Sequence, residues 1–476
     1  MAGPGSFSEM YGSGADIRPA YAGLSQWLEG VSIEELAKRH GAAELAFRRL
    51  GITFAVYGSD EGDEKIIPFD VIPRIVTGDE FASLEDGIVE RIDALQLFLA
   101  DIYGERRILK EGIIPEELVL ANPQFQPAMT RIKPPGGVYS HISGIDMVRT
   151  ADDFFVLEDN LRTPSGVAYM LENREAMLRL FPTLFQQHSV RPVESYIDYL
   201  QDMIRAVAPT GVRGDPVAVV LTPGALNSAY YEHSFLADRL GIELVEGSDL
   251  FVADRAVYMR TTEGPERVDV IYRRIDDDFL DPLAFRPDSI LGIAGLMDAY
   301  EAGNVTIVNA PGTGVADDKA IYSYVPEIVK FYMGLSSVED VKLKNVETWR
   351  CREPDALQHT LDNLSELVVK RVDASGGYGM LIGPAATKDE IDEFALRIKD
   401  DPDGYISQPT LALSTAPTVI GDGIAERHVD LRAFVVSGAE KTQVVPGGLT
   451  RVALEEGSLV VNSSQGGGTK DSWVLA

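Results

Sequence analysis

One apolar run, with the loop, helix and strand that follow it, constrains the fold of this chain more than any other feature. Residues 217–221 are all apolar, and the loop Thr222-Pro223-Gly224 comes directly after them. The pattern then predicts a helix from Tyr230 to Leu240 and a second strand over residues 242–245. A strand that is apolar on both faces is typical of a parallel sheet with helices on each side. We therefore expect a parallel α/β unit over about residues 191–310.

Composition bounds the class of protein. At 476 residues the chain is too long for one core, so two or three domains are expected. No run approaches the roughly 18 apolar residues that span a bilayer. The first residues lack the basic start and apolar stretch of a signal peptide. A single cysteine, Cys351, excludes an internal disulfide. Together these features predict a cytoplasmic protein.

The charge balance excludes some partners. The chain has 43 basic and 74 acidic residues, which gives a formal net charge of −31. Such a surface repels nucleic acid and anionic membranes, so neither is expected as a partner. A site for an anionic ligand such as ATP must therefore gather its own lysines and arginines.

A predicted hairpin gathers oxygen ligands. The strand over residues 154–160 ends in Glu158 and Asn160, which lie two positions apart and so share a face. Asp146 lies in the preceding strand, and a turn about Asp152 would place it directly opposite Glu158. Three oxygen donors on one face suit Mg²⁺, which usually accompanies the phosphates of a nucleotide. The alternative is a set of solvated acids at strand ends, which are common in so acidic a chain.

Two lysines and a glycine-rich stretch are candidates for phosphate binding. Lys370 ends an apolar strand, and three glycines follow within residues 374–380. Glycine backbones can turn their N–H groups toward an anion. Lys319 opens a predicted helix after a Pro/Gly loop. Gln408 closes a strand, where it could face an adenine. The duller alternatives are a hairpin turn, an exposed lysine and a Gln-Pro turn.

Charged residues also recur on one predicted strand face. His428, Asp430 and Arg432 alternate along residues 428–432. A buried unpaired charge is costly, so we expect either mutual pairing, such as a structural Asp–Arg pair, or a ligand. Arg451 follows a glycine pair in the same third of the chain. No hydrolase triad or zinc motif competes with these groups, and transition-metal chemistry is not expected.

Taken together, these motifs resemble the circularly permuted type 2 ATP-grasp proteins, which are related to the synthetase domain of glutathionylspermidine synthase. The resemblance runs from about residue 10 to the end. It is strongest over residues 157–166, 428–434, 447–451 and 461–474. It implies a fold of mixed α/β and α+β character in which the usual order is rotated. Glu158 and Asn160 accordingly precede Lys319 and Lys370 in this chain.

The resemblance implies four parts and a set of residue roles. The parts are an N-terminal helical segment (1–118), an ATP-grasp part with the magnesium motif (119–190), a preATP-grasp-like α/β domain (191–310) and a second ATP-grasp part (311–476). Mg²⁺ would be held by Asp146, Glu158 and Asn160. ATP would be bound by Lys319, Lys370, Ser375, Gly376, Gly377, Gly379 and Gln408. The acyl phosphate and the substrate carboxylate would be bound by Arg162, Arg432 and Arg451.

The implied activity is ligation of a carboxylate to an amine, with an acyl phosphate as intermediate and ADP as product. The substrates would be small-molecule or peptide-like. The alternatives are a phosphotransferase on the same fold and an ATP-binding partner protein that has lost catalysis. One departure concerns the acceptor: the relatives have an arginine two residues before the first magnesium aspartate, where this chain has Gly144. Arg131 and Arg149 are the candidates to replace that arginine, and the alternative is a different acceptor. Polyamine and glutathione are therefore not carried over as substrates.

Overall fold

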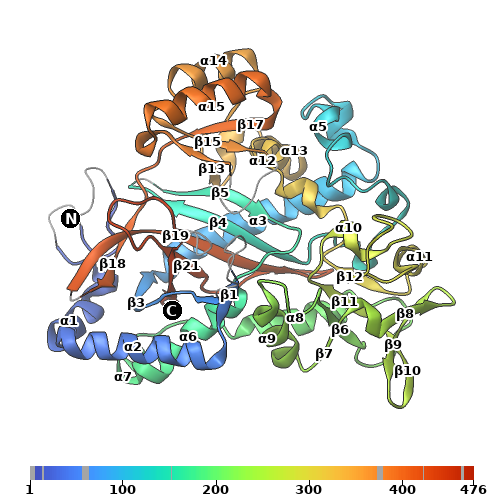
Figure 1. Ribbon diagram of the computed structural model, residues 1–476, viewed down its shortest axis with the longest axis horizontal. Helices are drawn as coiled ribbons and strands as arrows, with labels where there is room; N and C mark the ends of the chain where they lie inside the picture. Colours follow the sequence, from blue (N-terminus) through green and yellow to red (C-terminus); the bar gives the residue numbers. More distant parts are fainter. Residues whose placement is uncertain are drawn as a thin grey trace.

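The computed structural model describes residues 6–12, 16–55, 64–151, 153–372, 379–421, 423–461 and 466–476. A nine-stranded sheet lies at its centre (Figure 1). Its main path runs β13-β5-β4-β19-β21-β22-β3, and β18 and β20 also pair with β19. The strands are β3 (Phe69–Val76), β4 (Ile142–Arg149), β5 (Phe154–Asn160), β13 (Lys344–Asn345), β18 (Thr415–Ile420), β19 (Gly423–Ser437), β20 (Thr442–Val444), β21 (Leu449–Val452) and β22 (Gly468–Val474).

The N-terminal segment is helical only in part. It contains α1 (Ala22–Gly30), α2 (Ile33–Leu50) and α3 (Gly78–Ile102), and the side chain of Ser32 caps α2. It also supplies the small hairpin β1–β2 (Thr53–Ala55 and Glu64–Ile66) and the edge strand β3. β3 is buried along its whole length and contains Pro73, which an edge strand with a register shift tolerates. The boundaries at 118, 190 and 310 stay predictions.

The predicted parallel α/β unit is present. Four strands pair in the order β12-β11-β6-β7, and every pair is parallel. They are β6 (Ala218–Leu221), β7 (Glu243–Val245), β11 (Val270–Arg273) and β12 (Thr306–Val308), and α9 (Tyr230–Leu240) connects β6 to β7. An antiparallel sheet of β8 (Leu250–Ala253), β9 (Ala256–Thr261) and β10 (Gly264–Val268) extends from the unit.

A small antiparallel sheet stands beside the edge of the central sheet that β5 and β13 form. Its order is β14-β17-β15-β16, and α14 and α15 cover its outer face (Figure 1). The bounds are β14 (Trp349–Arg350), β15 (Leu367–Arg371), β16 (Leu381–Ile382), β17 (Tyr405–Pro409), α14 (Pro354–Asp362) and α15 (Lys388–Asp400). α12 (Lys319–Tyr322) lies between the two sheets, and α13 (Val325–Met333) packs against α3 (Figure 1).

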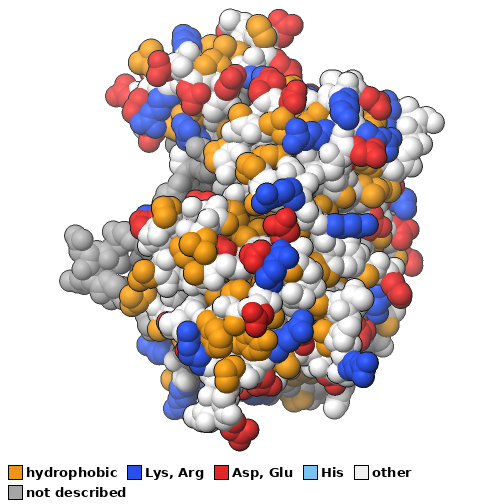
Figure 2. Space-filling view, turned by 90° about the vertical axis from the view of Figure 1, so that its right-hand side faces the viewer, with side chains coloured by type: hydrophobic (Ala, Val, Ile, Leu, Met, Phe, Trp, Pro, Cys, Tyr) orange, Lys and Arg blue, Asp and Glu red, His pale blue; other side chains and the backbone are white. Residues whose placement is uncertain are grey.

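The remaining helices connect these layers. They are α4 (Arg107–Lys110), α5 (Glu116–Leu120), α6 (Val167–Leu180), α7 (Pro182–Gln186), α8 (Ser195–Ala206), α10 (Asp277–Leu280) and α11 (Leu296–Glu301). Among the described residues, none of the helices is long and apolar enough to cross a bilayer. Figure 2 shows acidic and basic side chains interspersed over one face of the molecule.

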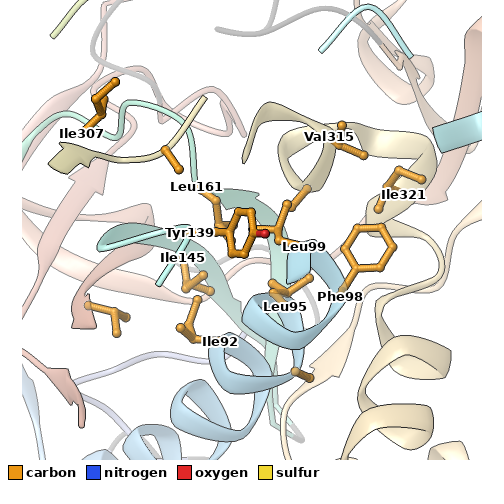
Figure 3. Packing of buried hydrophobic residues seen from close by; sticks show 14 of the residues in the cluster. Ile92, Leu95, Phe98, Leu99, Tyr139, Ile145, Leu161, Ile307, Val315 and Ile321 are labelled. Carbon is orange, nitrogen blue, oxygen red and sulfur yellow. The ribbon is translucent and has the colours of Figure 1, made fainter. Parts of the chain in front are cut away.

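One hydrophobic core underlies the hairpin that carries the predicted metal ligands. The apolar stripe of α3, including Ile92, Leu95 and Leu99, is fully buried. Figure 3 shows this stripe facing Ile145 of β4 and Leu161, which follows β5. The cluster also includes Ile307 of β12, Ile321 of α12, and Val315, which precedes α12. The hairpin, the parallel sheet and the segment that carries Lys319 therefore pack on the same hydrophobic core.

Candidate active site

The predicted pairing of Asp146 with Glu158 is present in the hairpin, although the register nearer the turn differs by one residue. β4 and β5 are antiparallel, and Asp146 lies directly opposite Glu158 while Gly144 lies opposite Asn160. Arg432 of β19 lies on the other side of Asp146 in the next strand pair. Directly opposed residues share one face of a sheet. Glu158, Asp146 and Arg432 therefore form one row across three strands.

A β-bulge directs the metal motif toward this face. The register shifts by one residue where Asp146 pairs with Glu158 but Met147 pairs with Val156, so Leu157 is the extra residue. Val156 is fully buried in the main core, whereas Leu157 packs in a smaller cluster. Without the extra residue, the alternation of side chains would place Glu158 on the same face as Val156. The bulge instead brings Glu158 to the polar row and turns Asp159 into the core.

Asp146 is held by two arginines. Arg432 donates from Nε and one terminal nitrogen to the two carboxylate oxygens, at 2.5 and 2.8 Å, and Arg451 donates at 2.9 Å. Burial alone would raise the pKa of Asp146, but the two guanidinium groups hold it below its ordinary value. Arg451 also pairs with Asp430, its neighbour across β19 and β21. The two charges of β19 therefore pair with other strands and not with each other: Arg432 pairs with Asp146 and Asp430 with Arg451, and the four side chains form one ion network.

The two lysines converge on this row from different elements. Asp318 caps α12, and the first residue of that helix, Lys319, places its Nζ 2.9 Å from Glu158 Oε1. Lys370, from β15 of the small sheet, donates to Gln408 Oε1 at 2.7 Å. Burial lowers the pKa of Lys370 to about 8; the nearby Glu158 and Asp146 counteract this, and Lys319 adds to it. The electrostatic effects of Glu158, Asp146 and Lys319 on Lys370 are consistent with one shared site.

Arg162 lies at the border of the site. Its guanidinium group makes the longest ion-pair contacts of the three candidate arginines. Its distances are 3.4 Å to Asp276 and 3.7 Å to Asp317, longer than those of Arg432 and Arg451 to their partners. Asp317 accepts hydrogen bonds from the backbone N–H groups of Leu161 and Arg162. Burial raises the pKa of Asp317 to about 7, although Arg162 opposes the shift. Asp317 thus connects the segment before Lys319 to Leu161 and Arg162, which follow the predicted metal ligands of β5.

Two supporting residues were missed by the sequence reasoning. Arg91 of α3 makes a bidentate pair with Asp159, at 2.7 and 2.6 Å, and both side chains are fully buried. Asn309 bonds the backbone of Ile142 and Leu161, at the two ends of the hairpin. The only sequence signal was Arg91 itself, a charge on the apolar stripe of α3. These contacts fix the strands that present the metal motif.

Comparison with known proteins identifies the family. The profile described as circularly permuted ATP-grasp type 2 matches residues 73–453. The chain belongs to this family. An uncharacterised protein of a Synechocystis species is 52% identical over 474 residues, covering 99% of this chain and 98% of its own length. An uncharacterised Mycobacterium tuberculosis protein is 50% identical over 472 residues, covering 99% of this chain and 84% of its own.

Two further relatives extend the comparison. A Frankia alni protein, provisionally named a glutamate–cysteine ligase, is 40% identical over 474 residues; the match covers 99% of this chain and 54% of that protein. A solved glutathione synthetase-like effector of Globodera pallida, in its apo form, has a TM-score of 0.62 at 13% identity. That match covers 94% of this chain and 98% of the effector, so it shows a shared fold. The rotated ATP-grasp order expected from the sequence is confirmed.

Within this permuted ATP-grasp chain, Gly144 has a different neighbour from those expected. Arg131 is exposed beside Glu301, and Arg149 pairs with Glu9 and Glu80. Neither lies at Gly144, so that expectation was wrong: Arg149 stands at the opposite end of β4 and its charge is already matched. A Cβ on Gly144 would lie 3.5 Å from Arg432 Cδ. The nearest atom to such a Cβ is Pro164 Cβ, at 3.2 Å, so the side chains of Pro164 and Arg432 both border position 144.

Part of the predicted nucleotide site falls outside the described residues. Ser375, Gly376 and Gly377 belong to that part. Gly379 is described and has a positive φ of 66°, a backbone conformation that favours glycine. Gln408 lies beside Lys370 and Thr348, on the β17 strand of the small sheet.

Asp146, Glu158 and Asn160 offer oxygen donors of the kind that Mg²⁺ prefers. In this structure Glu158 forms an ion pair with the Lys319 ammonium, and Asp146 forms ion pairs with two guanidinium groups. Both carboxylates therefore already have cationic partners. Asn160 donates to Gly144 O at 3.3 Å, which orients its amide. No group of three His, Cys, Asp or Glu side chains suited to a metal occurs among the residues described. Mg²⁺ commonly binds through one or two carboxylates and completes its shell with phosphate oxygens and water.

Proposed function

We propose that this protein is an ATP- and Mg²⁺-dependent ligase that joins a carboxylate to an amine through an acyl phosphate, releasing ADP. The observation that carries the proposal is the convergence of Lys319 and Lys370 on the row formed by Glu158, Asp146 and Arg432. Cations on one side of a site and oxygen ligands on the other are what phosphoryl transfer requires. The family match supports this assignment.

Each group has a role in the proposal. Asp146, Glu158 and Asn160 would hold Mg²⁺, which neutralises charge on the phosphates. Lys370 orients the phosphates, and its burial leaves its charge poorly compensated. Lys319 gains a phosphate partner as it leaves Glu158.

The carboxylate substrate would bind on the arginine side. Arg162 has the longest contacts of the three arginines, so an incoming carboxylate breaks the weakest interactions there. Arg432 and Arg451 remain anchored to Asp146 and Asp430 and present fixed positive charge to the acyl phosphate. The Frankia relative's name favours amino-acid or peptide-like substrates, since glutamate–cysteine ligation joins two amino acids.

The test measures products across pairs of acids and amines drawn from amino acids and short peptides. The expected products are ADP, phosphate and an amide, detected by mass spectrometry. AMP with pyrophosphate would contradict the proposal. A phosphorylated product without an amide would assign a phosphotransferase, and nucleotide binding without turnover of any pair would assign a partner protein that has lost catalysis.

A substitution in the metal row sharpens this test. Glu158→Gln removes a carboxylate charge with little change in shape, so we expect turnover to be lost while the thermal unfolding midpoint is retained. Glu393→Gln, on the exposed face of α15, is the matched control and should keep full turnover. Full activity in Glu158→Gln would move the metal site elsewhere.

A further inference from the structure

The side chain of Gln408 is buried and bonded at both ends of its amide. Its Oε1 accepts from Lys370 Nζ at 2.7 Å, and its Nε2 donates to Thr348 Oγ1 at 3.0 Å. Gln408 is only 2% exposed. Its backbone lies in the middle of the small sheet, where it pairs with Val368 of β15. The acceptor of the amide and one of its N–H groups are therefore already used within the protein.

The direction of these bonds is determined by Thr348. The hydroxyl of Thr348 donates its only hydrogen to Val346 O at 2.8 Å, so toward Gln408 it can only accept. The amide must then present its nitrogen to Thr348 and its oxygen to Lys370. Val346 is itself bonded to Val156 O of β5 at 3.1 Å. A series of hydrogen bonds, all donated in the same direction, thus connects the Lys370 ammonium to β5, the strand that carries predicted metal ligands.

A neutral partner has a specific consequence for Lys370. A glutamate at position 408 would neutralise the ammonium and compete with a phosphate for it, whereas an amide fixes the ammonium and leaves its charge intact. Among the described residues, Glu158 of β5 and Asp146 of β4 favour the charged form of Lys370, and Lys319 of α12 opposes it. Glu158 is already paired with Lys319, and Asp146 with two arginines. The nearby carboxylates are therefore committed elsewhere.

We propose that Gln408 is a positioning residue that aims Lys370 at the phosphates of the nucleotide without neutralising it, and that it does not read the base. This inference rests on the proposed function, because it takes Lys370 as a phosphate ligand. It revises the expectation that Gln408 lies against the adenine. It also assigns Thr348 the task of keeping the amide in one orientation.

The experiment compares ligands with and without a base. Calorimetry with Mg²⁺ would measure the affinities of ATP, GTP and inorganic tripolyphosphate for the wild type and for Gln408→Met, which is similar in size but accepts no strong hydrogen bond. Loss of one hydrogen bond to a charged group should weaken ATP and tripolyphosphate alike, by about tenfold, with the ATP-to-GTP ratio unchanged. Thr348→Val, which frees the amide to rotate, should weaken both by less.

A double-substitution cycle separates positioning from a general structural role. If Gln408 acts through Lys370, adding Gln408→Met to Lys370→Met should cause no further loss of tripolyphosphate affinity. Additive losses would overturn the proposal. So would a loss confined to ATP with tripolyphosphate unaffected, because that result would place Gln408 against the base. Wild-type protein that binds neither ligand would overturn the proposed function as well, whereas wild-type binding with an unchanged Gln408→Met variant would overturn this inference alone.

Discussion

Binding of ATP should take up a proton at Lys370. Burial lowers the pKa of this lysine to about 8 in the free protein. At about pH 8.5 roughly three quarters of the molecules would then carry a neutral Lys370, against about a tenth at pH 7. A triphosphate beside the ammonium favours the charged form and raises its pKa. Binding should therefore take up about 0.75 proton at pH 8.5 and about 0.1 at pH 7, and affinity should fall as pH rises above 8.

Calorimetry in buffers of different ionisation enthalpy measures this uptake directly, because the observed binding enthalpy varies with the buffer in proportion to the protons exchanged. Lys370→Met should abolish the dependence on buffer at about pH 8.5. Lys441→Met, at an exposed lysine that pairs with Asp202, is the control and should leave it unchanged. Measurable ATP binding with no uptake in the wild type, or uptake that persists in Lys370→Met, would refute the reasoning.

Three further predictions concern stability. Asp159→Asn leaves Arg91 buried without its carboxylate and should lower the free energy of unfolding by about 3–5 kcal/mol, measured by urea denaturation; a loss below 1 kcal/mol would contradict the buried pair. Thr77→Ala removes the capping box of α3 and should cost about 1 kcal/mol, visible as a lower thermal midpoint and no change in ATP affinity. Because the pKa of Asp146 is lowered in the folded state, this residue should contribute stability at neutral pH that is lost as pH falls below about 4. In Asp146→Asn the free energy of unfolding should therefore fall less steeply with acidification. An unchanged pH dependence in this variant would count against the arginine pairing.

The predictable parts of the fold were those set by local pattern. The apolar run at 217–221 indicated a parallel sheet because a strand buried on both faces has few other solutions. The pairing of Asp146 with Glu158 was predicted from a turn about Asp152, but in the structure it also requires the bulge at Leu157. The helix start at Lys319 followed from the Pro/Gly loop and the capping Asp318. Each of these inferences uses residues that are neighbours in sequence.

The missed parts depend on contacts between distant segments. No turn residue or glycine in the sequence indicates the bulge at Leu157. The bulge allows Asp159 to pair with Arg91 in the core while Glu158, the residue before it, pairs with Lys319. Of the two side chains that border Gly144, Arg432 comes from β19, far along the chain. Gln408 contributes a side chain whose partner is determined by the pairing of β15 with β17.

The parallel pairing of β3 with β22 has a consequence for how this protein reaches its native state. Residues 69–76 are synthesised before their partner, residues 468–474, so all of the chain between them must be made before the two strands can pair. Until then a strand that is buried along its entire length in the finished molecule has no neighbour on that side. Pairing over such separations is slow and exposes apolar edges meanwhile. The central sheet is therefore completed late, and the interval before β22 is available is when this protein is most prone to aggregate.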